Sequence, residues 1–275
     1  MESASGVAIE RRVYASDSDS SITRFIDRWI YVLMAGLLIA TALIGFIPDS
    51  LNKIGAVEMG RRRPFPAVLH VHAALMGSWL CLLFAQSWLM ATRRPASHRN
   101  LGMLSLALMP AIVATGFILI PTMREQLWQA AQAAPPAIAA QLQEVLAMTA
   151  NILLLQLRVG ILFPLFVVLA LLARRKDPGT HKRLMILAAV LPIPAAIDRM
   201  TWLPATMPES AASTDLYMLL WAVPMFAWDL YRSGRVHRAY VIWFGANLPF
   251  IALTHALWGS QWWAAMVPRI VGVGG

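Results

Sequence analysis

The chain has 275 residues, of which 59% are hydrophobic and 13% are charged, and its mean hydropathy is +0.61. A soluble domain has about 45–50% apolar and about 25% charged residues, so this composition excludes a typical soluble protein and predicts a polytopic membrane protein. The net charge of +9 is interpreted as a topology signal, and no segment is typical of nucleic-acid binding. The single cysteine, Cys81, excludes an internal disulfide and a cysteine-based zinc or iron–sulfur site.

Residues 1–24 are polar and rich in Ser and Asp, and we expect them to form a mobile cytoplasmic tail before one membrane domain over residues 25–275. Apolar segments of the roughly 20 residues that a membrane-crossing helix needs follow along the chain. They lie at 28–48, 67–91, 101–121, 147–173, 184–205, 215–231 and 239–258. The expected fold is therefore an all-α transmembrane helical bundle of about seven spans. Because the sixth segment is the shortest, six spans and one interfacial segment are the alternative.

The basic residues also predict the orientation of the bundle. With the N-terminus in the cytoplasm and the C-terminus outside, most of the 23 Lys and Arg residues lie in inner loops, as expected in a bacterial inner membrane. The segment 124–146 is rich in Ala and Gln and is broken by Pro135 and Pro136. We expect it to form two short helices on the outer interface.

The expected inner loops contain an internal repeat. The segment Arg94–Leu101 aligns with Asp177–Leu184, with Pro, a hydroxyl residue, His, a basic residue and Leu in register. A weaker copy, Gly234–Arg238, precedes the last apolar segment. The repeat predicts three related helical hairpins that follow an N-terminal span.

His98, His181 and His237 are the histidines of the three copies. In a structural interpretation, Ser97 and Thr180 are N-caps, and the histidines bond to a neighbouring turn or to lipid phosphate. In a functional interpretation, the three histidines form a proton relay or an inner metal or haem site. Both interpretations stay open at this point.

A second group of histidines, His70, His72 and His255, shares a depth in the expected outer half of the membrane. His70 and His72 lie about 200° apart around a helix, so they cannot face the same partner. His70 is preferred because it shares its face with small residues that leave room for a flat cofactor. A pair of His70 and His255 predicts bis-imidazole ligation of a b-type haem, or of another metal. Hydrogen-bonded packing of these histidines is the alternative.

Arg61, Arg62 and Arg63 precede the second apolar segment on the expected outer side, where basic residues are disfavoured. Such a position predicts a local anionic partner. Haem propionates, phospholipid headgroups and an acidic protein all fit this role.

Arg158, Asp198 and Arg199 are charged residues at membrane depth, and we expect them to face the bundle and to find partners. Asp198 is expected to pair with Arg158 or Arg199. The three residues predict a structural ion pair, a proton-carrying carboxylate or an anion site. Pro192 and Pro194 free backbone carbonyls just before Asp198, as in the discontinuous helices of binding sites.

The stretch from His70-Val71-His72 through Trp79 and Gln86 to His98–Gly102 resembles a pattern of uncharacterised bacterial multi-spanning membrane families, some with suspected haem-binding relatives. The resemblance covers the second and third expected spans, with a weaker copy at His181–Met185. It implies a helical membrane fold and a role for the histidines.

Three hypotheses for the function follow. The leading one is a protein that binds a b-type haem or a metal through His70 and His255, transfers electrons between a membrane quinone and an outer partner, and uses Asp198 as a proton carrier. The second is a transporter with a site formed by Arg158, Asp198 and Arg199. The third is a non-catalytic accessory or lipid-binding subunit of a membrane-protein complex.

Overall fold

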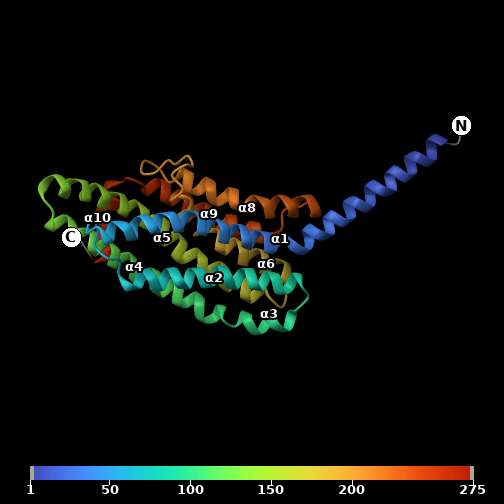
Figure 1. Cartoon of the computed structure of the whole chain (residues 1–275), viewed down its shortest axis with the longest axis horizontal. Helices are drawn as coiled ribbons and strands as arrows, with labels where there is room; N and C mark the ends of the chain where they lie inside the picture. Colours follow the sequence, from blue (N-terminus) through green and yellow to red (C-terminus); the bar gives the residue numbers. More distant parts are fainter. Residues whose placement is uncertain (1–2, 273–275) are drawn as a thin grey trace.

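The computed structural model describes the backbone of residues 3–272 and the side chains of residues 21–272. The secondary structure of this part of the chain is entirely α-helical. Its elements are α1 (Ser3–Glu58), α2 (Ala67–Ala91), α3 (Pro95–Gly102), α4 (Ser105–Ala133), α5 (Pro136–Ala173), α6 (Pro178–Val190), α7 (Pro194–Ile197), α8 (Ala212–Ser233), α9 (Arg238–Leu257) and α10 (Gln261–Val271). The long helices run side by side along one axis (Figure 1). The side chains of most of the expected tail, residues 1–24, lie outside the described residues.

Six helical segments among the described residues are long and apolar enough to cross a membrane. They are Ser21–Glu58, Ala67–Ala91, Pro95–Ala133, Pro136–Ala173, Pro178–Ile197 and Arg238–Leu257. The expected sixth span coincides with α8, which is not in this set and contains Asp215 and Asp229. The molecule is thus a helical bundle compatible with a multi-pass membrane protein, with six candidate spans in the described part rather than a confirmed seven.

Prolines determine where two helices of the repeat begin. Pro95 and Pro178 occupy the first turns of α3 and α6, where the missing N–H costs nothing. The helices therefore start earlier than expected, and Ser97 and Thr180 lie inside them rather than at the caps. Asp177 is the N-cap of α6, and it accepts hydrogen bonds from the hydroxyl and the N–H of Thr180. These bonds lower the pKa of the Asp177 carboxyl.

The segment 124–146 does not form separate interfacial helices. Residues up to Ala133 continue α4, and residues from Pro136 onward begin α5, with a turn at 134–135. The Ala-rich sequence has a high helix propensity, so the helices extend until the Pro135–Pro136 pair stops them. In contrast, the expected break near Pro192 is present, because α6 ends at Val190 and α7 begins at Pro194.

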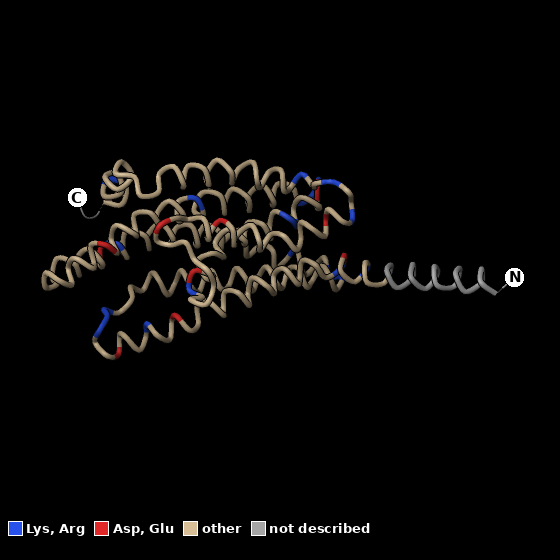
Figure 2. Tube along the Cα trace, turned by 90° about the horizontal axis from the view of Figure 1, so that it is seen from above, with Lys and Arg blue, Asp and Glu red and all other residues tan. Residues whose placement is uncertain are grey.

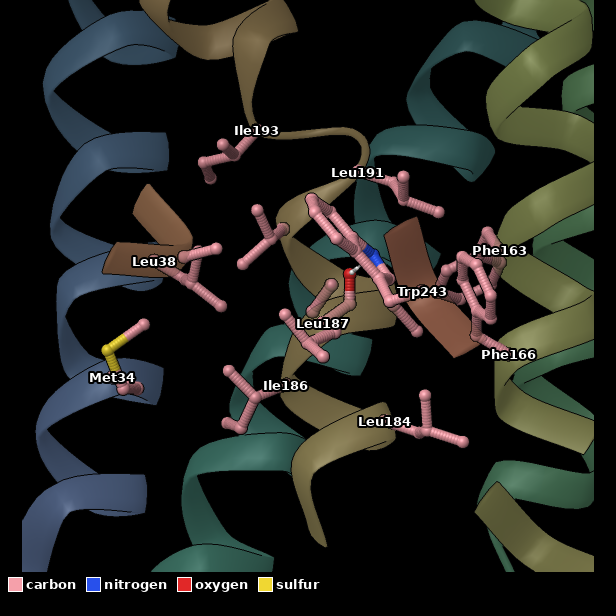
Figure 3. Close-up of a cluster of buried hydrophobic side chains, with 14 of the residues drawn as sticks. Met34, Leu38, Phe163, Phe166, Leu184, Ile186, Leu187, Leu191, Ile193 and Trp243 are labelled. Atoms are coloured by element: carbon pink, nitrogen blue, oxygen red, sulfur yellow. Dashed lines mark hydrogen bonds between the residues drawn. The ribbon is translucent and has the colours of Figure 1, made fainter. Parts of the chain in front are cut away.

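The core surrounds α6, whose residues from Ile186 to Leu191 are almost fully buried. Figure 3 shows Leu187 and Leu191 between Leu38 of α1 and Phe163 of α5, with Trp243 of α9 close by. The indole Nε1 of Trp243 donates to the backbone carbonyl of Leu187 at 3.1 Å, so the buried N–H is satisfied. The core thus fixes α1, α5 and α9 around the helix that leads to the break at Pro192.

The two ends of the bundle differ in charge. At the end that holds α3, Figure 2 shows several Lys and Arg positions close together. This end contains the basic turns that follow α2, α5 and α8. The sides of the bundle expose large apolar side chains, such as Leu172, Val241 and Ile118. Such surfaces favour contact with a lipid bilayer.

Candidate functional site

A carboxylate buried between three helices lies at the centre of the most polar part of the bundle interior. Asp215, in the first turn of α8, accepts from Nη1 of Arg158 on α5 at 2.5 Å through one oxygen. Its other oxygen lies 2.9 Å from Nε2 of His255 on α9. The side chains of Arg158 and Asp215 are 1% and 8% exposed, whereas that of His255 is 39% exposed. We call these three residues the Arg–Asp–His cluster.

The position of Asp215 favours a negative charge. The N-terminus of α8 carries the positive end of the helix dipole, and the guanidinium of Arg158 is a fixed positive charge. An arginine this deeply buried requires such a partner. The imidazole of His255 connects the buried carboxylate to the surface of the bundle, so a proton can reach Asp215 through one hydrogen bond.

Three buried polar atoms on the same three helices have no hydrogen-bond partner among the described residues. They are Nε of Arg158, Oγ1 of Thr214 and Oδ1 of Asn247. Buried polar groups are nearly always hydrogen-bonded, so each of these exceptions indicates capacity for a polar ligand or water. Oδ1 of Asn247 accepts hydrogen bonds, the Thr214 hydroxyl can donate or accept, and the Arg158 N–H donates.

The structure separates the charged residues that the sequence groups together. Arg158 pairs with Asp215, not with Asp198. Arg199 lies 3.0 Å from Asp49 of α1 and also donates to the carbonyl of Ala195. Asp198 is exposed at the end of α7. The expected span assumes one continuous helix through Asp198. Because α6 ends at Val190 and a new helix starts at Pro194, the side chain of Asp198 does not follow the helical register of α6.

The three histidines expected in the outer half of the membrane contact three different partners. His70 is exposed and contacts Phe65 edge-on, with 6.4 Å between the ring centroids. His72 is the one that faces a neighbouring helix, with Nδ1 3.0 Å from the hydroxyl of Thr115 on α4. α4 therefore packs on the face of α2 that carries His72, whereas His70, the histidine preferred from the sequence, lies on an exposed face. His255 is engaged with Asp215.

Arg61, Arg62 and Arg63 are exposed in the turn before α2. The guanidinium of Arg62 lies over the ring of Phe65, 4.5 Å from its centroid. This cation–π contact explains the position of Arg62 without an anionic partner.

Two histidines of the repeat meet at the basic end of the bundle. The rings of His98 and His181 have centroids 6.4 Å apart and planes at 86°. Nδ1 of His98 lies 3.3 Å from the carbonyl oxygen of Gln86, and Nδ1 of His181 lies 2.9 Å from that of Ala170. A carbonyl only accepts, so each Nδ1 carries the proton and each neutral ring keeps a lone pair on Nε2. We call these residues the inner histidine pair.

His237 differs from the inner histidine pair. It is the N-cap of α9, and its Nδ1 accepts from the N–H of Ala239 at 3.2 Å. Its neutral tautomer therefore carries the proton on Nε2, the opposite of His98 and His181. The third copy of the repeat thus has a capping role and does not offer a free Nε2.

Asp229 forms a second charge cluster within the bundle that the sequence analysis does not single out as a site. Its carboxylate binds the guanidinium of Arg183 in a bidentate manner at 2.5 and 2.7 Å, and it accepts from the hydroxyl of Tyr240 at 2.5 Å. Both oxygens of this carboxylate accept hydrogen bonds, and the side chains around it are largely buried, which is typical of a structural ion pair. It joins α6, α8 and α9.

The sequence does contain a signal for both missed carboxylates. Asp215 and Asp229 are the acidic residues of an otherwise apolar segment, and Arg158 and Arg183, which lie within or directly before other apolar segments, need partners. Among the described residues, no three or more His, Cys, Asp or Glu side chains gather as a metal site. Comparisons with protein-family models, with curated proteins and with solved structures find no match.

Proposed function

We propose that the chain is a proton-coupled carrier of small organic anions in the bacterial inner membrane, with its N-terminus in the cytoplasm and its C-terminus outside. The Arg–Asp–His cluster is the site for both the anion and the proton. The observation that carries the proposal is a buried carboxylate shared between a buried arginine and a partly exposed histidine.

The electrostatics of the cluster couple the two ligands. If a proton binds Asp215 alone, the buried guanidinium of Arg158 loses its counter-charge, which is costly in a low-dielectric environment. If an anion binds Arg158 alone, two negative groups compete for one cation. When both bind, His255 passes the proton to Asp215 and the anion replaces the carboxylate at Arg158. The site then carries the same net charge as before, so a proton and a monovalent anion move together.

Unpartnered polar atoms near this site support an organic anion as the ligand. Nε of Arg158 offers a second donor beside Nη1, and a guanidinium binds carboxylates in a bidentate manner. Thr214 directly precedes Asp215 in the chain, and its hydroxyl can donate to the same anion.

We infer that α8 is the seventh span. Its Leu216, Leu220, Val223 and Leu230 are exposed at helical spacing, which makes one face of α8 suitable for lipid. Its two carboxylates lie on the other side, where Arg158 and Arg183 neutralise them. The charges that lower its hydropathy are thus paired within the bundle.

The carrier proposal predicts anion-driven proton uptake that depends on His255. In proteoliposomes that contain a pH-sensitive dye, external lactate, pyruvate or glycolate should acidify the lumen. We expect His255→Ala to slow this acidification at least about tenfold, because the proton path to Asp215 is lost. His255 is partly exposed and is not needed to neutralise Arg158, so this variant should fold.

Arg232→Ala is the control, because Arg232 belongs to an exposed ion pair with Asp27. It should acidify the lumen at the rate of the unchanged protein. Equal rates for His255→Ala and the unchanged protein would contradict the proposal, and so would the failure of all three anions to move protons.

A second candidate function is electron transfer through a b-type haem or a metal ion, and the inner histidine pair favours it. Histidines that bind metals donate their other N–H to a carbonyl or a carboxylate, as both rings of the pair do. A metal lies about 2 Å from each ligating nitrogen, which requires ring centres about 6 Å apart. The observed separation is 6.4 Å. A haem would supply one-electron chemistry here, and basic residues such as Arg99 and Arg174 would hold its propionates.

Optical spectra of variants distinguish haem ligation by the inner histidine pair from haem ligation by His70 and His255, the ligands expected from the sequence. If the inner histidine pair binds haem, the purified protein should show a Soret band that His98→Ala and His181→Ala abolish and His70→Ala leaves unchanged. Loss of the band in His70→Ala and His255→Ala instead would favour the outer site. Ligation at the outer site requires a change at His255, because its Nε2 is the atom that meets Asp215. A quinone partner and an accessory or lipid-binding role remain further hypotheses.

A further inference from the structure

We propose that a pocket between α1 and α2, at the basic end of the bundle, binds the phosphate group of an anionic phospholipid. The pocket has a volume of about 580 Å³, and three arginines line it: Arg24 and Arg28 from α1, and Arg93 from the turn after α2. Basic pockets between transmembrane helices are the typical sites for anionic headgroups. The inference is independent of the carrier proposal.

The positive charge of this pocket is not neutralised by its own residues. Asp27 is the acidic residue of the lining, and its carboxylate accepts from the guanidinium of Arg232 at 2.9–3.2 Å and from the indole of Trp228 at 2.9 Å. It is therefore already paired outside the pocket. Among the described residues, Arg24 and Arg93 form no ion pair with a carboxylate. In the part of the chain that the structure describes, the lining thus holds three arginines and one carboxylate, and Arg232 already engages that carboxylate.

Arg28 is fixed in place at the base of this pocket. Its Nε donates to the carbonyl of Ala91 at the end of α2, 2.6 Å away, and its guanidinium lies 5.5 Å from the centroid of the Trp29 ring. Among the described residues, no side chain or carbonyl engages the other N–H groups of its planar guanidinium, and these groups can bind phosphate oxygens. A fixed guanidinium binds with a smaller loss of side-chain entropy than a mobile one.

The backbone of Arg93 supports a ligand-binding role. Its φ is +60°, in the left-handed region that favours glycine, at the position after the helix where glycine is most common. The N–H of Arg94 donates to the carbonyl of Leu89, which closes this turn. An arginine is retained at a strained position, and strained backbone of this kind is often found at ligand-binding residues. The turn directs the residue toward the pocket, where it is part of the lining.

Apolar walls beside the arginines favour a lipid over a free phosphate. Phe25 is 58% exposed and Met90 is 50% exposed, and both line the pocket. Trp29 and Trp88 stack edge-on next to it, with 5.2 Å between ring centroids, as in the aromatic belt at a membrane interface. A phosphate with attached acyl chains satisfies both the cationic and the apolar surfaces.

The test is native mass spectrometry of the full chain in detergent, titrated with phosphatidylglycerol or phosphatidylcholine. We expect phosphatidylglycerol to bind more tightly, and Arg93→Gly and Arg24→Gln each to weaken its binding about fivefold, the effect of one basic residue near a lipid surface. Arg93→Gly relieves the backbone strain, so its melting temperature should not fall, and weaker binding cannot be attributed to unfolding. Arg99→Gln removes a basic residue of α3 that does not line the pocket, and this variant should bind as the unchanged protein does.

Three results would overturn the proposal. Unchanged phosphatidylglycerol affinity in Arg93→Gly and Arg24→Gln would exclude the pocket as the site. Displacement of the lipid by millimolar inorganic phosphate, with the same dependence on Arg93, would keep the phosphate site and overturn the lipid as its source. Equal binding of the two lipids would exclude recognition of the anionic headgroup.

Discussion

Replacement of Arg158 by alanine should lower the free energy of unfolding by about 3–5 kcal/mol, the largest effect that we expect from a single substitution in this protein. The carboxylate of Asp215 would stay buried without its counter-charge. Because the side chain of Arg158 is only 1% exposed, water cannot reach its place to solvate that carboxylate. Equilibrium unfolding in mixed detergent micelles measures the loss.

A double substitution is the control for this prediction. Arg158→Met together with Asp215→Leu replaces both charges by apolar side chains of similar size, and such replacements of buried ion pairs are often neutral or stabilising. We expect the double variant to recover most of the stability that Arg158→Ala loses, while it loses proton-coupled transport. If Arg158→Ala costs less than about 1 kcal/mol, Arg158 is not a buried charge and the proposed coupling has no basis.

Gly45→Ala should lower the free energy of unfolding by about 3 kcal/mol, because added volume in a packed interface forces backbone shifts. Gly45 lies where α1 crosses α7, and an added Cβ would overlap with the carbonyl oxygen and the carbonyl carbon of Ala196. These are backbone atoms, so no side-chain rotation can remove the clash. The same substitution should weaken the ion pair between Asp49 and Arg199, one turn further along α1. Thermal unfolding in detergent measures the first effect.

Gly77→Ala is the matched control on α2. A Cβ at Gly77 meets nothing within 4 Å, so the substitution adds helix propensity without a clash. We expect an unchanged or higher stability, by up to about 1 kcal/mol. Equal stability of the two alanine variants would show that α1 and α7 do not pack as closely as the structure places them.

Local sequence features predicted the helices well. The second expected span, 67–91, coincides with α2 at both ends, because its apolar run is bounded by Pro66 and by the basic turn at Arg93. The break near Pro192 was also expected from the prolines themselves. The start of α6 was misplaced by a few residues, because Asp177 competes with Thr180 for the cap and Pro178 fixes the first turn.

Partner choice could not be predicted in the same way. The sequence indicated that Arg158 must face the bundle and find a partner, and Asp198 was the carboxylate expected in that role. Asp215 was assigned to the edge of a span, although the packing of α8 places it in the interior. The sequence analysis treated residues 184–205 as one helix and so placed Asp198 on its inner face. The helix ends at Val190, and Asp198 is exposed.

The sequence by itself determined the class of the protein, the position of its apolar helices and the presence of charges that need partners, since these depend on composition and local spacing. The tertiary structure alone decided which charges meet. It joined Arg158, Asp215 and His255 from three helices, and it placed His98 next to His181. These contacts join residues far apart in the chain, and the packing of helices against one another, which no local pattern encodes, brings them together.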